Sequence, residues 1–359
     1  MTEEYILECE NDWILQEDLD FIANMDFPFE VFKNCTFLIS GATGLIGSLL
    51  IKALLCCDRR RELNIRVLGL VRDINKAKRI YQNCFERSNL KFLIADLQYD
   101  KIETDEKIDY IIHTAAITNS KKMITKPCDT INTAINGTIS LLNLAVEKDI
   151  RTFLYLSSME IYGDACEKSL IKEQDLGYID LENLRNCYPE SKRMCECLCI
   201  AYANQYGLNT VSARLAQTFG AGVIKDENRV FAQFAKSVIE NRDIVLHTTG
   251  KSEGNYCYSR DAIKALLLLL IYGKKGESYN ISNERCHTTI KNMAELVASN
   301  IAGGKIKVVC DLPKNNNIYG YASDKKMKLD ASKMRGLGWK PEVDLKEAYE
   351  RMIESMRLY

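Results

Sequence analysis

From residue 35 onward, short apolar runs alternate with longer stretches in which apolar residues recur at helical spacing. The runs at 37–40, 65–71, 91–94, 110–114 and 152–156 predict buried strands, and the stretches at 45–57, 75–87, 130–147 and 189–206 predict helices. Strands and helices that alternate in this way form a parallel sheet with helices on both faces. The pattern therefore predicts an α/β fold with a doubly wound parallel sheet, whose ligands bind at the carboxyl ends of the strands.

The order of predicted helices and strands differs at the two ends of the chain. Residues 1–34 form a preamble in which Asn11 or Asp12 is suited to cap a helix. After about residue 215, predicted helices at 230–241, 261–271, 290–300 and 345–356 mix with short strands at 244–247 and 307–310. We expect a helical preamble at 1–34, a sheet domain at 35–215 and a smaller mixed α/β domain at 216–359, some of which returns to the first sheet.

Composition excludes several classes of partner. The formal net charge of the 359 residues is −1, which favours neither nucleic acid nor an anionic membrane. The longest purely apolar run, 265–272, is far shorter than the roughly 20 residues that span a bilayer. The acidic start lacks the basic and apolar regions of a signal peptide, so we expect a cytoplasmic protein.

The cysteines and histidines show no metal-binding spacing. The 14 cysteines contain no C-x-x-C pair, and His113, His247 and His287 are scattered. We expect reduced thiols in small apolar gaps and no metal site.

A glycine-rich segment follows the first predicted strand directly. Gly41 permits a tight turn, Gly44 lets a phosphate approach the backbone, and Gly47 lets the next helix pack closely on the sheet. A pyrophosphate then lies on the N–H groups at the start of the helix. The segment predicts a Rossmann-type site for a nicotinamide dinucleotide, held by Gly41, Thr43, Gly44, Leu45, Ile46 and Gly47.

The choice between NAD and NADP stays open. The second strand ends at Arg72 and Asp73, of which the arginine suits the 2′-phosphate of NADP and the aspartate can reach a ribose. Asp96 and Leu97 follow the third strand and are placed to contact adenine, although Asp96 also suits a turn. Small residues end the fourth strand and let the backbone approach the nicotinamide half: Thr114, Ala115 and Ala116.

A tyrosine and a lysine one helical turn apart suggest proton-transfer chemistry. Tyr188 and Lys192 lie on the same face of the predicted helix, where the positive charge of the lysine lowers the pKa of the phenol. Ser158, at the end of the fifth strand, is placed to hydrogen-bond the reacting oxygen, and Lys192 also to hold the nicotinamide ribose. Such a pair alone is common on helix surfaces, but the glycine segment and Ser158 upstream favour a catalytic role.

These motifs resemble the extended short-chain dehydrogenase/reductases of the nucleotide-sugar epimerase/dehydratase group, from about residue 35 to the end. The resemblance implies tightly bound NAD(P), hydride abstraction from a sugar carbon, a transient keto-sugar and often hydride return to the same substrate. Many relatives dimerise through a four-helix bundle of the helices matching 130–147 and 189–206, so we expect a homodimer.

Within that group, the segments around Glu160 and Arg185 look most like UDP-glucuronate decarboxylases and 4,6-dehydratases. In those enzymes the residue matching Glu160 assists proton movement beside the sugar; the alternative here is an ion partner or a cap. Three departures put the substrate in doubt. Gln217 stands where the family has Asn, Gly254 where it has a cation, and Ala134 where an Asn is common. The residues expected to contact the substrate are Gln217, Arg229 and Tyr258, and Arg229, Lys251 or Arg260 can replace the missing cation.

Three functions fit these residues. The first is a nucleotide-sugar epimerase, dehydratase or decarboxylase that recycles its cofactor. The second is a net NADPH-dependent reductase of a keto-sugar or another carbonyl, for which Arg72 is the main support. The third is a non-enzymatic dinucleotide-binding regulator, which the presence of both Tyr188 and Lys192 disfavours.

Overall fold

A seven-stranded parallel sheet forms the centre of the protein. The computed structural model describes residues 6–165, 169–312 and 326–358. The strand order is β10-β6-β5-β4-β1-β2-β3, and every neighbouring pair is parallel. The strands are β1 (Thr36–Ser40), β2 (Arg66–Val71), β3 (Leu90–Ile94), β4 (Tyr110–His113), β5 (Thr152–Ser158), β6 (Thr210–Leu215) and β10 (Glu277–Ile281). The expected α/β class and doubly wound parallel sheet are confirmed.

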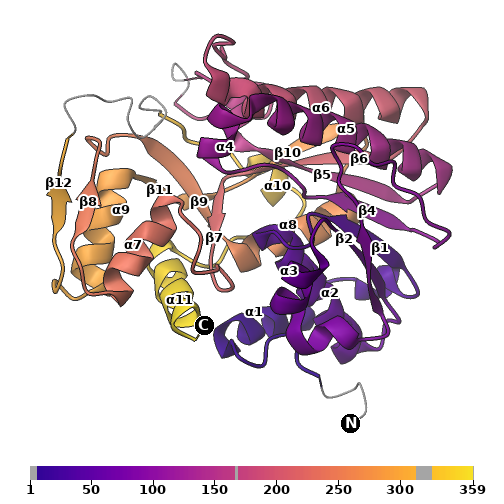
Figure 1. Ribbon diagram of the computed structural model, residues 1–359, viewed down its shortest axis with the longest axis horizontal. Coiled ribbons are helices and arrows are strands. Elements are labelled where there is room, and N and C mark those ends of the chain that lie inside the picture. The colour runs from indigo at the N-terminus through magenta and orange to yellow at the C-terminus, as the bar shows by residue number, and fades with distance from the viewer. Residues whose placement is uncertain (1–5, 166–168, 313–325, 359) are drawn as a thin grey trace.

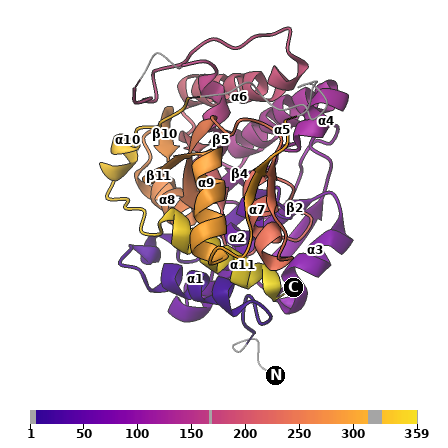
Figure 2. The same ribbon diagram turned by 90° about the vertical axis from the view of Figure 1, so that its left-hand side faces the viewer.

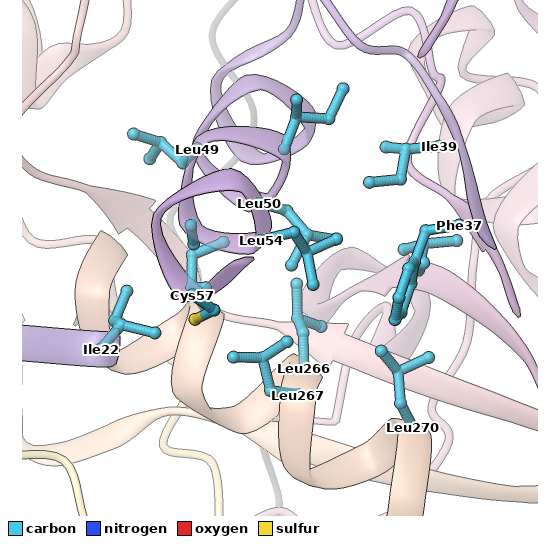
Figure 3. Close-up of a cluster of buried hydrophobic side chains, with 14 of the residues drawn as sticks. Ile22, Phe37, Ile39, Leu49, Leu50, Leu54, Cys57, Leu266, Leu267 and Leu270 are labelled. Carbon is cyan, nitrogen blue, oxygen red and sulfur yellow. The ribbon is translucent and has the colours of Figure 1, made fainter. Parts of the chain in front are cut away.

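Helices cover both faces of this sheet (Figure 1). One face carries α5 (Pro127–Glu147) and α6 (Cys187–Gln205), and the other carries α2 (Leu45–Arg61), α3 (Ile74–Tyr81) and α8 (Ser259–Tyr272). Figure 3 shows the second face, where Leu50 and Leu54 of α2 approach Leu266 and Leu270 of α8 beside Phe37 of β1. Because both faces are buried, strands β1 to β5 are mostly apolar runs, which is why the sequence pattern predicted them.

A smaller unit holds a second core (Figure 2). Its sheets are β11-β9-β7, formed by β7 (Gln217–Phe219), β9 (Glu253–Tyr258) and β11 (Asn283–Thr289), and the pair β8 (Ile244–Leu246) and β12 (Val308–Cys310). Its helices are α7 (Val230–Ile239), α9 (Ile290–Leu296) and α11 (Leu345–Arg357). The short helix α10 (Ser332–Arg335) instead packs on the core of the large sheet through Met334. The chain passes from β6 into β7 and returns to the large sheet at β10; the domain division near residue 215 stays a prediction.

The preamble connects the two cores. Asp12 caps α1 (Trp13–Asn24) by accepting a hydrogen bond from the Leu15 amide. Asp18, in the middle of that helix, accepts hydrogen bonds from Tyr258 at the end of β9 and from Arg351 of α11. Helix α1 therefore packs on α2 of the large unit while its buried carboxylate binds the small unit. Within the described ranges, no helix has the length and apolar character needed to cross a membrane.

Candidate active site

The glycine segment makes a tight turn between β1 and α2. Gly41 has a φ of +69°, and a Cβ there would lie 2.7 Å from Thr114 Oγ1. A Cβ on Gly47 would lie only 2.3 Å from the carbonyl oxygen of Gly41. Thr114 at the end of β4 fixes the turn by donating a hydrogen bond to the Ser40 carbonyl at 2.6 Å. The turn therefore has no room for side chains at positions 41 and 47.

The start of α2 is suited to hold a phosphate. Gly44 is the N-cap of this 17-residue helix and supplies no side-chain cap to its first-turn N–H groups. Such groups, together with the positive end of the helix dipole, bind anions. The turn from Gly41 to Gly47, which has no room for side chains at these two positions, and the uncapped N–H groups after it fit the pyrophosphate of a nicotinamide dinucleotide.

A pocket of about 200 Å³ opens at this helix start, at the carboxyl ends of the strands. It brings together residues from the glycine turn, the ends of β4 and β5, helix α6 and the segments around β7. The predicted site residues that line it are Gly44, Leu45, Ile46, Gly47, Thr114, Ala116, Ser158, Glu160, Tyr188, Lys192, Gln217 and Arg229. Most of the catalytic, cofactor and substrate candidates thus share one cavity.

Tyr188 and Lys192 are buried in the first two turns of α6. Burial and the charge of Glu160 raise the pKa of Tyr188, while a hydrogen bond with Ser158 opposes that rise. Lys192 Nζ donates to the Leu156 carbonyl at 2.6 Å, and burial lowers the pKa of Lys192 to about 8. Without a bound cation the phenol keeps its proton, so its use as a base depends on positive charge brought close to it.

Glu160 forms a two-pronged ion pair beside this group. Arg185 donates to its two carboxylate oxygens at 2.6 and 3.0 Å. Both side chains are largely buried, 16% and 13% exposed. Glu160 lines the pocket as well, so it is an ion partner and a neighbour of the reaction site at once. Among the described residues that line this cavity, it is the sole carboxylate.

The remaining predicted residues lie elsewhere. Gly41, Thr43 and Ala115 belong to the turns beside the pocket but are not part of its lining. Arg72 lines a second cavity, and Leu97 is buried against Gly137 in α5.

Two more candidates have partners in the fold. Asp96 Oδ1 accepts a hydrogen bond from the Gln98 amide, as a turn residue does. Tyr258 is buried, and its hydroxyl binds Asp18 of the preamble. That side chain is outside the pocket lining, so we do not carry Tyr258 forward as a substrate ligand.

Some site residues were not singled out from the sequence. Thr118 and Met123 line the pocket from the segment after β4, where no local pattern marks them. Arg185 stands three residues before Tyr188 in a short turn, Leu184–Asn186, that leads into α6. The segment around Arg185 contributed to the family resemblance, but the pairing of this arginine with Glu160 depends on the fold.

The side chains that commonly bind metal ions are scattered in the parts of the chain that are described. No group of three or more His, Cys, Asp or Glu side chains is arranged there to hold a metal ion. The cysteines among these residues are free thiols, most of them buried.

Comparisons with known proteins identify the family. The NAD dependent epimerase/dehydratase family matches residues 37–282. A dTDP-D-glucose 4,6-dehydratase of Bos taurus is 27% identical over 333 residues, covering 89% of this chain and 88% of that protein. UDP-glucuronic acid decarboxylase 3 of Arabidopsis thaliana is 29% identical over 340 residues, covering 90% of each.

Solved structures share the fold. UDP-glucuronic acid 4-epimerase of Bacillus cereus, in complex with UDP-glucuronic acid and NAD, matches with a TM-score of 0.74 at 22% identity, over 90% of this chain and all of that one. UDP-glucose 4-epimerase of Thermotoga maritima, with UDP-glucose, has the same TM-score of 0.74 at 21% identity, over 90% of this chain and 98% of that one. The glycine turn, the Tyr188–Lys192 group and the family match agree with the resemblance found in the motifs, and the chain belongs to the NAD dependent epimerase/dehydratase family.

Proposed function

We propose that this protein oxidises a carbinol carbon of a nucleoside-diphosphate sugar and then returns the hydride to the same molecule, either after a change at a neighbouring carbon or onto the opposite face of the oxidised carbon. The observation that carries the proposal is that Ser158, Tyr188 and Lys192 line one pocket with the phosphate-binding start of α2. A bound nicotinamide dinucleotide supplies the hydride acceptor and then the hydride donor.

Each residue of the group has a distinct task. The N–H groups after Gly44 bind the pyrophosphate, and Lys192 binds the ribose next to the nicotinamide. Tyr188, deprotonated when cationic groups surround it, takes the proton of the sugar hydroxyl. Ser158 hydrogen-bonds that oxygen and holds it toward Tyr188, which lines the same pocket. The proton returns from Tyr188 to the oxygen when the keto group is reduced.

The pocket favours decarboxylation or epimerisation over loss of water. Elimination of water needs an acid for the departing oxygen and a base for the neighbouring C–H proton. Glu160 is the one carboxylate among the described lining residues, it is bound by Arg185, and its neighbour Met159 is apolar. Loss of carbon dioxide from a sugar whose carboxylate lies β to the new keto group needs only subsequent protonation of the enolate carbon. Because one relative is named a dehydratase and another a decarboxylase, the experiment must distinguish loss of water from loss of carbon dioxide.

Arg229 is our candidate for binding the sugar diphosphate. It lines the pocket beside Gln217, and Glu227 holds it at 2.7 Å. Gly254, where the family has a cation, leaves open space, since the nearest atom to an added Cβ is Met159 Cε at 4.0 Å. A planar guanidinium forms paired hydrogen bonds with phosphate oxygens, which fits Arg229 for this task.

Mass spectrometry of small molecules and products tests the reaction. The purified protein is incubated with a panel of UDP-, dTDP-, GDP- and CDP-sugars, including uronic acids, without added reductant. We expect a product lighter by carbon dioxide, or of unchanged mass with altered stereochemistry. A product lighter by water would overturn the preference for decarboxylation, and turnover only with stoichiometric NADPH would replace the proposal with the reductase.

A matched pair of variants links the reaction to the pocket. Tyr188→Phe removes the proton acceptor and is expected to lower turnover by about a hundredfold or more while cofactor binding stays the same. Tyr202→Phe removes a hydroxyl from the same helix, where it is bonded to Asn143, and is expected to keep full turnover. Equal activity of the two variants contradicts the assignment of Tyr188.

We further propose that the protein is a homodimer built on α5 and α6. Ile131 on α5 and Met194 and Ile200 on α6 are apolar and exposed. A face of this kind is buried when two copies form a four-helix bundle. Light scattering of the purified protein is expected to give twice the chain mass, and Met194→Glu to shift it toward one chain mass. A wild-type monomer would refute the assembly.

A further inference from the structure

A second pocket, of about 630 Å³, adjoins the first. Ala116 and Thr118 line both cavities, so the second continues the first from the end of β4. It reaches Arg72, the residue that directly follows β2. In a dinucleotide fold whose pyrophosphate lies at the first glycine turn, the adenosine ribose lies at the end of this second strand.

Positive charge dominates this pocket. Arg72 enters from β2, Lys121 and Lys122 from α4 (Ser120–Thr125), and Lys126 from the turn into α5. The one carboxylate among the described residues that line it is Asp129, which faces Lys126 at 3.8 Å. Three of the four cations therefore have no carboxylate of the pocket lining as an ion partner.

The carboxylates that would bind a ribose diol already have partners. Asp73 caps α3, where one of its oxygens accepts hydrogen bonds from the amides of Asn75 and Lys76 at 2.9 and 3.1 Å. Asp96 accepts from the Gln98 amide at 3.0 Å, and its other oxygen lies 3.9 Å from Arg72. An acidic residue at the end of the second strand selects the 2′-hydroxyl of NAD, and here one oxygen of Asp73 is engaged as a helix cap while Asp96 already faces Arg72 and the Gln98 amide.

We propose that Arg72, with Lys121, Lys122 and Lys126, forms a binding site for the 2′-phosphate of NADP, so that this chain prefers NADP to NAD. The side chain of Arg72 is 61% exposed, and its carboxylate neighbour, Asp96, lies at 3.9 Å, so the guanidinium can turn to form paired hydrogen bonds with a phosphate. Lys121, Lys122 and Lys126 line the same pocket and add positive charge to it. The inference rests on the dinucleotide binding of the proposed function but not on its sugar chemistry.

Calorimetric titration of the cofactor-free full chain with 2′,5′-ADP and with 5′-ADP isolates the 2′-phosphate. We expect 2′,5′-ADP to bind about tenfold more tightly or better, since hydrogen bonds to charged groups are among the strong ones. Arg72→Gln is expected to remove most of that difference and to leave 5′-ADP binding unchanged. Lys122→Gln is expected to reduce it severalfold.

Arg66→Gln is the matched control, because Arg66 is exposed at the opposite end of the same strand β2. It is expected to bind both probes as the wild type does. Equal affinity of the wild type for the two probes, or an equal loss of both in Arg72→Gln, overturns the inference.

Whole cofactors separate this inference from the proposed function. Titrations with NADP⁺ and NAD⁺ are expected to show the same preference and the same effect of Arg72→Gln. A protein that turns over nucleotide sugars but prefers NAD⁺ would refute the 2′-phosphate site alone. A preference for NADP⁺ with no turnover of any nucleotide sugar would refute the proposed function and leave this site standing.

Discussion

Replacing Gly47 by alanine has two opposite effects on the free energy of unfolding: a gain in helix propensity and a loss from steric overlap. Gly47 is the third residue of α2, and alanine inside a helix is favoured over glycine by about 1 kcal/mol. The added Cβ, however, would lie 2.3 Å from the Gly41 carbonyl oxygen and 2.9 Å from Thr114 Oγ1. Overpacking of this kind costs about 1–3 kcal/mol. The free energy of unfolding is therefore expected to stay level or to fall by up to about 2 kcal/mol.

Cofactor binding responds more strongly than stability does. To relieve the contact, the start of α2 moves away from the turn at Gly41, and the N–H groups after Gly44 move with it. We expect the dinucleotide to bind at least tenfold more weakly, which corresponds to the loss of about one good hydrogen bond to a charged group. Urea unfolding gives the stability and calorimetric titration gives the dissociation constant.

Gly254→Ala provides the control for this prediction. Its added Cβ has no neighbour closer than 4.0 Å, so it forces no movement. We expect dinucleotide binding by this variant to match that of the wild type. If Gly47→Ala were more stable than the wild type and bound the dinucleotide equally well, the close contact at Gly41 would not govern the site.

Three further changes test the site and its supporting core. Glu160→Gln keeps the size of the side chain but removes its charge. With Glu160 as the proton donor to the enolate carbon after decarboxylation, we expect the first reduction of the dinucleotide, followed by absorbance, to persist while the decarboxylated product forms about a hundredfold more slowly. Unchanged formation of that product would remove Glu160 from the chemistry, and epimerisation at the oxidised carbon is expected to be unaffected. Burial lowers the pKa of His113 from 6.5 to about 3, so the folded state binds fewer protons than the unfolded state between those values. Stability is therefore lost as the pH falls below 6.5, by about 1.4 kcal/mol per pH unit, and urea unfolding of His113→Gln at several pH values is expected to show a correspondingly flatter slope. Arg214→Met removes the ion partner of the buried Glu196 carboxylate, which lies 2.6 Å from Arg214 in the wild type. We expect the free energy of unfolding to fall by about 3 kcal/mol or more, and adding Glu196→Leu to restore part of it. An Arg214→Met variant as stable as the wild type would contradict this account.

The sequence predicted the strands and helices that have a regular pattern of apolar residues. The expected helix at 45–57 corresponds to α2, Leu45–Arg61, and the expected strand at 37–40 to β1, Thr36–Ser40. Both depend on local regularities, a continuous apolar run for a strand covered on two faces and a 3.6-residue repeat for a helix. The expected helix at 75–87 was too long, since α3 ends at Tyr81 and Gln82 takes a φ of +46°.

The sequence pattern did not predict strands β6 and β10 of the large sheet, because both strands bury polar side chains. Strand β6 contains Arg214, which binds Glu196 of α6. Strand β10 contains Asn280, which accepts a hydrogen bond from Tyr162 at 2.6 Å. A buried polar residue is stable where a partner satisfies it, and these partners lie 18 and 118 residues away. The sequence pattern records the polarity of such a residue but not its partner.

The sequence alone determined the fold class and the glycine turn, because turn geometry, helical spacing and strand burial are properties of neighbouring residues. It also predicted Ser158, Tyr188 and Lys192 as a catalytic group, which stays a prediction. Only the tertiary structure decided that Arg185 binds Glu160, that Tyr258 faces the preamble, and that Arg72 shares a pocket with the lysines after β4. Each of these outcomes joins elements far apart in the chain. Their contacts depend on how helices and strands pack against one another, and local periodicity carries no information about which distant charge will be the neighbour.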